Sequence, residues 1–516
     1  MSQNSDKDKR IAKNTLLLYF RMIFIMLITL YTSRVVLSTL GVEDYGIYNV
    51  VGGVVATFSV ISGSLSASIS RFLTYELGRQ NKERLTTVFS TSVNIQICLS
   101  AIIVILAETV GLWFLNEKMN ISPERMTAAN WVYQCSIITF IINLISVPYN
   151  ATIIAHERMA AFAYVSILEV VLKLLVVYLL AMSPMDQLQF YAILIMLVAL
   201  IVRIVYQVYC TRNFDECRYH FVFDSSILKQ MSAFAGWNFI GASAGVLRTQ
   251  GVNVVINLFY GATINAARGI SVQINTAVTS FANNFMTALN PQIMKSYAIG
   301  DFDYMNKLIF KGARLAFYML LLLSLPIIIE AETILKIWLK EVPDHSVEFV
   351  QLILLFALCE AISGPLITAM LATGDIKRYQ IIIGGTNLLN LPISYILLKM
   401  FGFADYPEIT MIVAIVLSFI CLMQRLWIMK DMINLDSRGF FNKVILRVLF
   451  VMALSFILPF GTHTLTHDNT LLSLGNIVIC VIYTSCIIYF VGCEKQEKVF
   501  VINKIKDIKR KITKRG

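Results

Sequence analysis

Long apolar runs, separated by short polar and charged stretches, recur along this 516-residue chain from one end to the other. Each run has about 20 residues, which is enough for a helix to cross a hydrocarbon core of ~30 Å. The pattern therefore predicts an all-α integral membrane protein. Its fourteen predicted spans cover residues 14–38, 46–70, 87–115, 129–154, 161–182, 188–210, 229–259, 264–292, 311–332, 347–372, 379–400, 408–430, 442–461 and 470–492.

The cations between the runs predict how these helices are oriented. When alternate loops are assigned to alternate sides, 32 Lys and Arg lie on the side of the two termini and 5 on the opposite side. Because cytoplasmic loops are enriched in Lys and Arg, both termini are expected in the cytoplasm. The formal charge of +11 then reflects topology, and we expect no nucleic-acid partner.

Composition excludes a soluble helical core. Charged residues make up 15% of the chain and apolar residues 57%, with a mean hydropathy of +0.70, whereas soluble domains carry roughly 25% charged residues. The first run follows the cations Lys7, Lys9, Arg10 and Lys13, as in a signal peptide. It is too long for such a peptide and lacks a small-residue cleavage site, so we expect a retained helix.

An internal repeat predicts how the helices are grouped. The segment AETVGLWFL (107–115) returns as AETILKIWL (331–339). Spans 1–6 and 7–12 are thus predicted to be two parallel six-helix repeats around a central cavity, with the last two helices as an addition. Two further pairs recur at offsets of about 217 to 222 residues: SVPYNATIIAHER (146–158) with SGPLITAMLATGD (363–375), and SRFLTYELGRQNKERL (70–85) with NPQIMKSYAIGDFDYMNKL (290–308).

The repeat gives a plan of domains. We expect an N-terminal lobe over 1–210, a cytoplasmic linker over 211–228, a C-terminal lobe over 229–430, helices 13 and 14 over 431–492, and a basic tail over 493–516. Within the tail, isoleucines recur at near-helical spacing among cations. The tail is either an amphipathic helix on anionic lipid or a solvated basic segment.

Residue types that support enzymatic chemistry are not grouped in this sequence. It has no GxxxxGK[ST] motif, and its loops outside the membrane stay within about twenty residues. The nine Cys show no CxxC spacing, and the five His (156, 220, 345, 463 and 467) are scattered. We therefore expect no enzyme, no metal site and no cofactor, and a protein that moves a substrate.

Charged residues inside the spans are the candidate functional groups, since each costs about 2.5–3.5 kcal/mol on insertion. Arg21 and Arg203 lie near cytoplasmic ends and can reach the interface. Glu169 and Lys173 stand four residues apart on one helix, so they either neutralise each other or serve the cavity.

Arg34 and Arg248 lie about 20 residues into the first and seventh helices. When the repeats are aligned on Gly41 and Gly261, the two arginines do not coincide, which favours placement for a ligand over inheritance with the scaffold. Together with Arg268, they could bind phosphate, pyrophosphate or an acidic sugar through bidentate hydrogen bonds. The alternative is ion pairing, with Glu360 as the acid. A wet lumen suited to sugar hydroxyls is indicated by amides in spans 7 and 8: Asn253, Asn257, Gln273, Asn275, Asn283 and Asn284.

GVEDYGIYNVV (41–51), which follows a long first helix with a basic start, resembles the beginning of Wzx-type polysaccharide flippases. These belong to the multidrug/oligosaccharidyl-lipid/polysaccharide exporter superfamily. Fourteen spans, the 6+6 repeat plus two helices and the polar linker extend the resemblance over the whole chain.

The resemblance implies a flippase that moves an undecaprenyl-pyrophosphate-linked oligosaccharide, such as an O-antigen, lipopolysaccharide or capsule unit, across the bacterial inner membrane by alternating access. Coupling to H⁺ or Na⁺ and work beside a polysaccharide polymerase fit the superfamily. In the cationic cavity that it implies, Arg34, Arg248, Arg268 and Lys173 would bind substrate, with Glu360 and Glu169 as coupling or ion-pair acids.

Two other functions remain open. A cation-coupled multidrug or metabolite exporter of the same superfamily would build its site around acids. A membrane enzyme of glycan assembly is disfavoured by the short loops.

Overall fold

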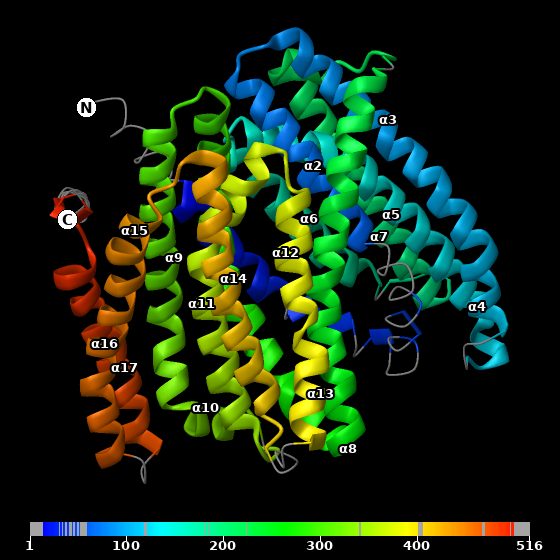
Figure 1. Cartoon of the computed structure of the whole chain (residues 1–516). Coiled ribbons are helices and arrows are strands. Elements are labelled where there is room, and N and C mark those ends of the chain that lie inside the picture. Colours follow the sequence, from blue (N-terminus) through cyan, green and yellow to red (C-terminus); the bar gives the residue numbers. More distant parts are fainter. Residues whose placement is uncertain are drawn as a thin grey trace, which may run out of the picture. The chain divides into compact units, whose positions relative to one another are not determined.

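The computed structural model describes residues 14–29, part of 31–51, and 59–499 with gaps at 118–120, 181, 184, 223, 340–341, 401–405, 467–469 and 496. Within these residues all regular structure is helical, which confirms the predicted all-α class. The helices are the first helix Asn14–Thr29, then α2 (Ser59–Gly78), α3 (Lys82–Leu106), α4 (Leu112–Glu117), α5 (Met126–Ala155), α6 (Met159–Leu180), α7 (Gln187–Asn213), α8 (Ser225–Ala298), α9 (Phe302–Ile329), α10 (Ala331–Trp338), α11 (Ser346–Thr373), α12 (Lys377–Leu388), α13 (Asn390–Met400), α14 (Ile409–Ile433), α15 (Ser437–Phe440), α16 (Leu446–Thr466) and α17 (Thr470–Ile487) (Figure 1).

Ten helical segments in the described part of the chain are long and apolar enough to cross a membrane. Each coincides with one of the predicted spans. The other four predicted spans fall on the shorter apolar helix Asn14–Thr29, on α2 and on α8, which covers two. The total of fourteen therefore stays a prediction, while a multi-pass membrane protein is established.

Large apolar side chains point outward along these helices, as expected where lipid is the solvent. Trp113 is 54% exposed, Tyr178 60% and Ile457 64%. In water such a surface would be unfavourable, because monomeric soluble proteins rarely expose contiguous apolar patches of more than a few hundred Å².

The chain forms two compact units, each made of several segments. Unit 1 contains Met1–Ser243, Thr287–Phe302 and Leu371–Gln380. Unit 2 contains Ala244–Met286, Asp303–Met370 and Ile381–Gly516. Both ends of α8 thus belong to unit 1 and its middle to unit 2.

Helix α8 must reverse its direction, although its 74 residues are helical throughout. A straight helix from Met231 to Ala298 would be about 100 Å long at 1.5 Å per residue. Both residues nevertheless contact α2: the Ser68 hydroxyl donates to the Met231 carbonyl at 3.1 Å, and Ala298 lies against Gly78. Ser68 and Gly78 are only about 15 Å apart along α2. The two spans predicted between 229 and 292 therefore form the two arms of one bent helix.

Helix ends recur at the spacing of the predicted repeat. α2 ends with Gln80 at φ 57°, and α8 ends 220 positions later with Gly300 at φ 76°. In both turns an amide donates to the carbonyl five residues earlier, which is the Schellman arrangement: Asn81 to Glu76 at 3.3 Å, and Asp301 to Ser296 at 2.9 Å. The backbone of the two repeats is thus alike even where the residues differ.

The ends of α5 and α11 show the same relation, with Glu157 at φ 58° and Gly374 at φ 81°. Each of these turns is held by a long side chain within unit 1. Arg71 of α2 donates to the Ala372 carbonyl at 3.2 Å, and Gln292 of α8 donates to the Glu157 carboxylate at 2.6 Å. The contacts are reciprocal, because α2 and α8 are equivalent helices of the two repeats and each holds a turn of the other repeat.

Helices α16 and α17 pack against α9 within unit 2 (Figure 1). The Tyr318 hydroxyl donates to the Gly492 carbonyl at 3.4 Å, and the rings of Phe310 and Phe440 meet edge to face at 5.3 Å. The added helices are therefore fixed to the third spanning helix of the second repeat.

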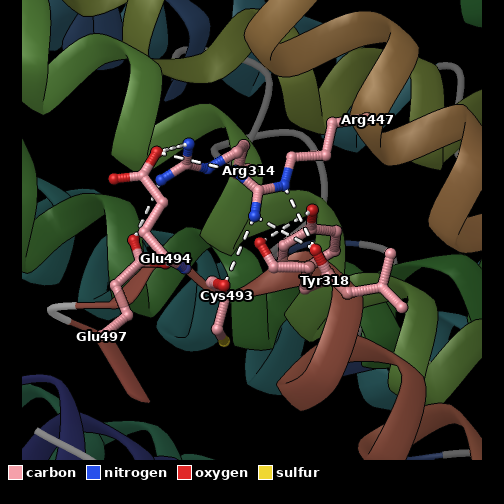
Figure 2. A network of polar contacts seen from close by, with 8 residues as sticks. Arg314, Tyr318, Arg447, Cys493, Glu494 and Glu497 are labelled. Carbon is pink, nitrogen blue, oxygen red and sulfur yellow. Dashed lines mark hydrogen bonds and ion pairs between the residues drawn. The ribbon is translucent and has the colours of Figure 1, made fainter. Parts of the chain in front are cut away.

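The start of the tail is held by the same helix, as Figure 2 shows. The buried guanidinium of Arg314 binds the carboxylates of Glu494 and Glu497, the latter at 3.0 Å, and Arg447 donates to the Val491 carbonyl at 3.1 Å. Arg314 is one of the 32 cations assigned to the side of the termini, and these carboxylates balance its charge. Most of the basic tail, 493–516, lies outside the described residues, so both interpretations of it stay predictions.

Candidate substrate and ion site

Four helices of unit 2 bring polar side chains together near the middles of their lengths. Glu360 stands halfway along α11, Asn387 lies in the middle of the α12–α13 segment, and Ser418 lies in the middle third of α14. Arg248 comes from the first arm of α8. Because the middle of a spanning helix lies near the bilayer midplane, this cluster occupies the depth at which transporters of related design bind their substrates.

Arg248 is the centre of the cluster. Its Nη1 donates to Oδ1 of Asn387 at 2.9 Å and stands 4.0 Å from Oε1 of Glu360. The guanidinium also lies over the Phe356 ring, 4.9 Å from the ring centroid, where a cation is attracted to the π face. The Arg248 side chain is 17% exposed and that of Glu360 26%, so neither charge is sealed off.

Hydroxyl and amide groups on α12 and α14 extend the cluster. The Ser418 hydroxyl donates to Glu360 at 2.5 Å, and Thr386 donates to Gln424 at 3.1 Å. Arg425 is buried and donates to the Ser363 hydroxyl at 2.9 Å. The arrangement joins one loosely held ion pair, a second guanidinium and several groups able to bind hydroxyls.

The predicted ion pair between Arg248 and Glu360 is thus present in the structure. At 4.0 Å it is at the limit of direct contact, and Glu360 is bound more closely by Ser418. Both of the predicted roles of Arg248, anion binding and ion pairing, remain compatible with such a weak pair, because an anionic ligand could replace the carboxylate.

Lys173 and Glu169 form a tight pair within α6, with Nζ 2.6 Å from Oε1. Their side chains are 43% and 38% exposed, respectively. The structure therefore favours mutual neutralisation over a role in binding for these two residues.

The other two predicted cations have different outcomes. Arg268 is buried in α8, and its carbonyl accepts a hydrogen bond from the Ser271 hydroxyl at 2.7 Å. Arg34 lies outside the described residues. The structure brings Arg248 together with Glu360 and Lys173 with Glu169.

Sequence reasoning missed Asn387, Ser418 and Gln424, and it did not predict that Arg425 is buried. Polar residues within the runs 379–400 and 408–430 were the available signal. Hydropathy cannot tell whether such residues point to one another, because the direction of each side chain depends on helix rotation.

Three of the five scattered histidines lie against a glutamate far away in sequence. His156 contacts Glu216 at 2.5 Å, His463 contacts Glu330 at 2.9 Å, and His345 is in direct contact with Glu408. Burial opposes ionisation of Glu216, but the hydrogen bond and charge of His156, a backbone hydrogen bond and the charge of Lys82 together lower the pKa of the Glu216 carboxyl. The pairings come from the fold, since at least 60 residues separate the partners.

More than half of the chain matches a known family: the model of the polysaccharide biosynthesis protein family matches residues 11–297. The chain belongs to this family. A second model, MatE, matches residues 246–396, the region that contains Arg248, Glu360 and Asn387.

A curated relative of this polysaccharide biosynthesis protein is the uncharacterized membrane protein EpsK of Bacillus subtilis. The two are 21% identical over 302 residues, which cover 58% of this chain and 59% of EpsK. The match thus spans less than two thirds of the relative.

Solved structures of transporters share the fold. A MATE protein in its bent conformation is 12% identical, with a TM-score of 0.72 over 84% of this chain and 97% of that chain. An outward-facing multidrug resistance MATE transporter of the MOP superfamily is 14% identical, with a TM-score of 0.69 over 83% and 96%. A Pyrococcus furiosus MOP transporter, described as having a binding pocket of reverse polarity, is 14% identical, with a TM-score of 0.67 over 84% and 96%.

These comparisons agree with the resemblance given by the sequence. The family is that of the polysaccharide biosynthesis proteins, and a transporter among the solved structures has the same fold. At identities this low, the solved structures show the fold alone.

Proposed function

We propose that this chain is a flippase for an undecaprenyl-pyrophosphate-linked oligosaccharide, which it moves from the cytoplasmic to the periplasmic leaflet of the bacterial inner membrane by alternating access. The family assignment supports a substrate from polysaccharide assembly. The observation that carries the proposal is the position of Arg248 near the midplane, in a weak ion pair and among amide and hydroxyl groups.

The cluster suits the two chemical parts of such a substrate. A guanidinium binds phosphate oxygens through two parallel hydrogen bonds, and pyrophosphate offers several such oxygens. Asn387, Thr386 and Gln424 can exchange hydrogen bonds with sugar hydroxyls. Since Glu360 competes with an anionic ligand for Arg248, binding H⁺ or Na⁺ at Glu360 would release the guanidinium. This competition would couple a cation gradient to the substrate.

The other residues predicted to line the cavity differ in the roles that we propose for them. Arg34 and Arg268 are proposed to add positive charge to the same cavity. Lys173 and Glu169 neutralise each other on α6, so we assign them no part in binding. The excess of basic residues near the termini supports a cytoplasmic location for both ends, and a polysaccharide polymerase is the proposed next component.

The test uses a strain that lacks the chain and assays whether its lipid-linked glycans are accessible from outside in spheroplasts. Wild type, Arg248→Ala, Arg248→Lys and Lys173→Ala are each restored. We expect wild type and Lys173→Ala to clear the cytoplasmic pool, and Arg248→Ala to lose at least about tenfold in the rate of clearance. Arg248→Lys should fall between them, because lysine keeps the positive charge but lacks the planar guanidinium that donates two parallel hydrogen bonds.

Equal membrane levels of all four proteins are the control for folding. The proposal is wrong if the glycan reaches the outer leaflet at the normal rate without this chain and without a second flippase. The assignment of Arg248 to the substrate site is wrong if Arg248→Ala and Lys173→Ala clear the glycan at the same rate.

A cation-coupled multidrug or metabolite exporter is the second candidate, and Glu360 is the observation in its favour. An accessible carboxylate that accepts from Ser418 could bind a cationic solute directly. In that case Glu360→Gln would abolish cation export, while the lipid-linked glycan would be unaffected.

A further inference from the structure

The two repeats join the starts of equivalent helices with different chemistry. In the first repeat, Arg125 stands just before α5 and binds Asp186, the N-cap of α7, at 2.6 Å, and also Asp44. In the second repeat, His345 stands just before α11 and contacts Glu408, just before α14. His345 follows Arg125 by 220 positions and Glu408 follows Asp186 by 222, so the pairs occupy equivalent places.

The charges at the two places do not match. Arg125 supplies a permanent cation to two carboxylates. In the second repeat the two carboxylates are Glu408 and Glu348, and the group beside them is the imidazole of His345. His345 directly precedes α11, and Glu348 lies in its first turn, three residues later. The second repeat therefore has a nitrogen ligand able to bind a metal ion where the first repeat has a guanidinium, which cannot.

The three side chains converge closely enough to share one ion. The ligand atoms of His345, Glu348 and Glu408 all lie within 4.8 Å of one another. Around a tetrahedral zinc ion, ligand atoms are about 3.3 Å apart at bond lengths near 2.0 Å. Glu348 is exposed and can move the remaining distance, while Glu408 is held from the other helix.

We propose that His345, Glu348 and Glu408 form a binding site for a divalent transition-metal ion such as Zn²⁺, which fastens the start of α11 to the start of α14. One imidazole and two carboxylates are a donor set that zinc accepts, and a water would complete the four ligands. Each helix N-terminus contributes about +0.5 charge, and together these offset only half of the two carboxylate charges. The neighbouring Asp344, also exposed, adds further negative charge.

Metal binding is measured on the full chain, purified in detergent with a tag free of histidine and treated with a chelator. Co²⁺ is the spectroscopic probe, because its visible ligand-field bands report tetrahedral coordination, and Zn²⁺ is titrated by calorimetry. We expect one equivalent of either ion to bind wild type, and Zn²⁺ to raise the melting temperature.

Three variants separate a metal site from an ion pair. Glu348→Gln removes a ligand but leaves the His345–Glu408 contact, and should weaken Zn²⁺ binding at least about tenfold. His345→Arg copies the first repeat, and should abolish metal binding while keeping the melting temperature of the metal-free protein. His220→Gln, an exposed histidine outside the cluster, should bind metal like wild type.

The proposal is overturned if wild type binds no Co²⁺ or Zn²⁺, or if Glu348→Gln and wild type bind equally. It is also overturned if acid raises the melting temperature of wild type while Zn²⁺ has no effect, because the cluster would then be a protonated ion pair. None of these outcomes depends on which substrate the protein transports.

Discussion

The two copies of the AET segment begin with the same three residues and fold differently. In the first copy, α3 continues through a π-helical turn, Ala107–Gly111, into α4. The Tyr133 hydroxyl donates to the Ala107 carbonyl at 2.8 Å. A Cβ on Gly111 would lie 2.0 Å from that hydroxyl, so the bulge requires glycine there.

In the second copy, α9 ends at Ile329 and α10 begins at Ala331. Between them Glu330 leaves the helical conformation (φ −104°, ψ 30°) and is 1% exposed. Its carboxylate accepts from Asn476 at 2.7 Å and contacts His463 at 2.9 Å. These partners lie on α17 and α16.

The residue that precedes AET decides this difference. Glu330 holds the added helices to α9, whereas its counterpart Leu106, 224 positions earlier, is 43% exposed and faces outward. A leucine in lipid needs no partner, while a carboxylate in an apolar region does. The comparison teaches that side chains which differ at equivalent backbone positions, such as Glu330 and Leu106, decide that α16 and α17 pack on the second repeat and not on the first.

Glu330→Leu gives the second copy the residue of the first and should have the largest effect. It removes one of the two acceptors of the buried Asn476 amide and the carboxylate that contacts the ring of His463, and we expect a loss of about 1–3 kcal/mol in stability. The measurement is the melting temperature in detergent. Leu106→Ala is the matched control and should change it little; equal shifts would contradict the docking role of Glu330.

Arg125→His gives the first repeat the residue type of the second, and a smaller effect is expected. The partners are partly exposed, so the loss at pH 8 should be about 1 kcal/mol. A histidine beside two carboxylates has its pKa raised on folding. Its stabilising charge is therefore present below the ordinary pKa of about 6.5 and is lost as pH rises.

The melting temperature of Arg125→His, measured between pH 5.5 and pH 8, should approach that of wild type at the acid end. If the two melting temperatures differ by the same amount across this pH range, the shape of the Arg125 side chain, and not its charge, is what stabilises the contact.

Acid release of the tail from the second repeat is the smallest expected effect. Burial opposes ionisation of Glu494, but the hydrogen bond and charge of Arg314 outweigh it and lower the pKa of the Glu494 carboxyl. The contact is thus formed above the unfolded-state pKa near 4.3 and is lost as pH falls through the lower folded value.

Limited proteolysis after Lys495 and Lys498 should accordingly be slow at pH 7, and Glu494→Gln should make it faster at that pH. An acid-tolerant protease should cut wild type faster at pH 3.5 than at pH 5. If Glu494→Gln is cut at the wild-type rate at pH 7, the Arg314 contact does not hold the tail.

Much of the architecture followed from the sequence. The apolar runs predicted the spanning helices, because a single segment in lipid can pair its backbone N–H and C=O groups with one another only as a helix. The recurring segments 70–85 and 290–308 include two helix ends, and the structure has matching turns there at Gln80 and Gly300. The sequence also named Arg248 and Glu360, since a charge within an apolar run is costly wherever it points.

The partners of these residues were decided by the tertiary structure alone. Asn387 and Ser418 meet Arg248 and Glu360 only because four helices pack with a particular rotation, which hydropathy does not encode. The approach of His345 to Glu408 joins residues 63 positions apart. A sequence records which groups must avoid lipid; their pairing depends on distances between helices, and these exist only once the helices have packed.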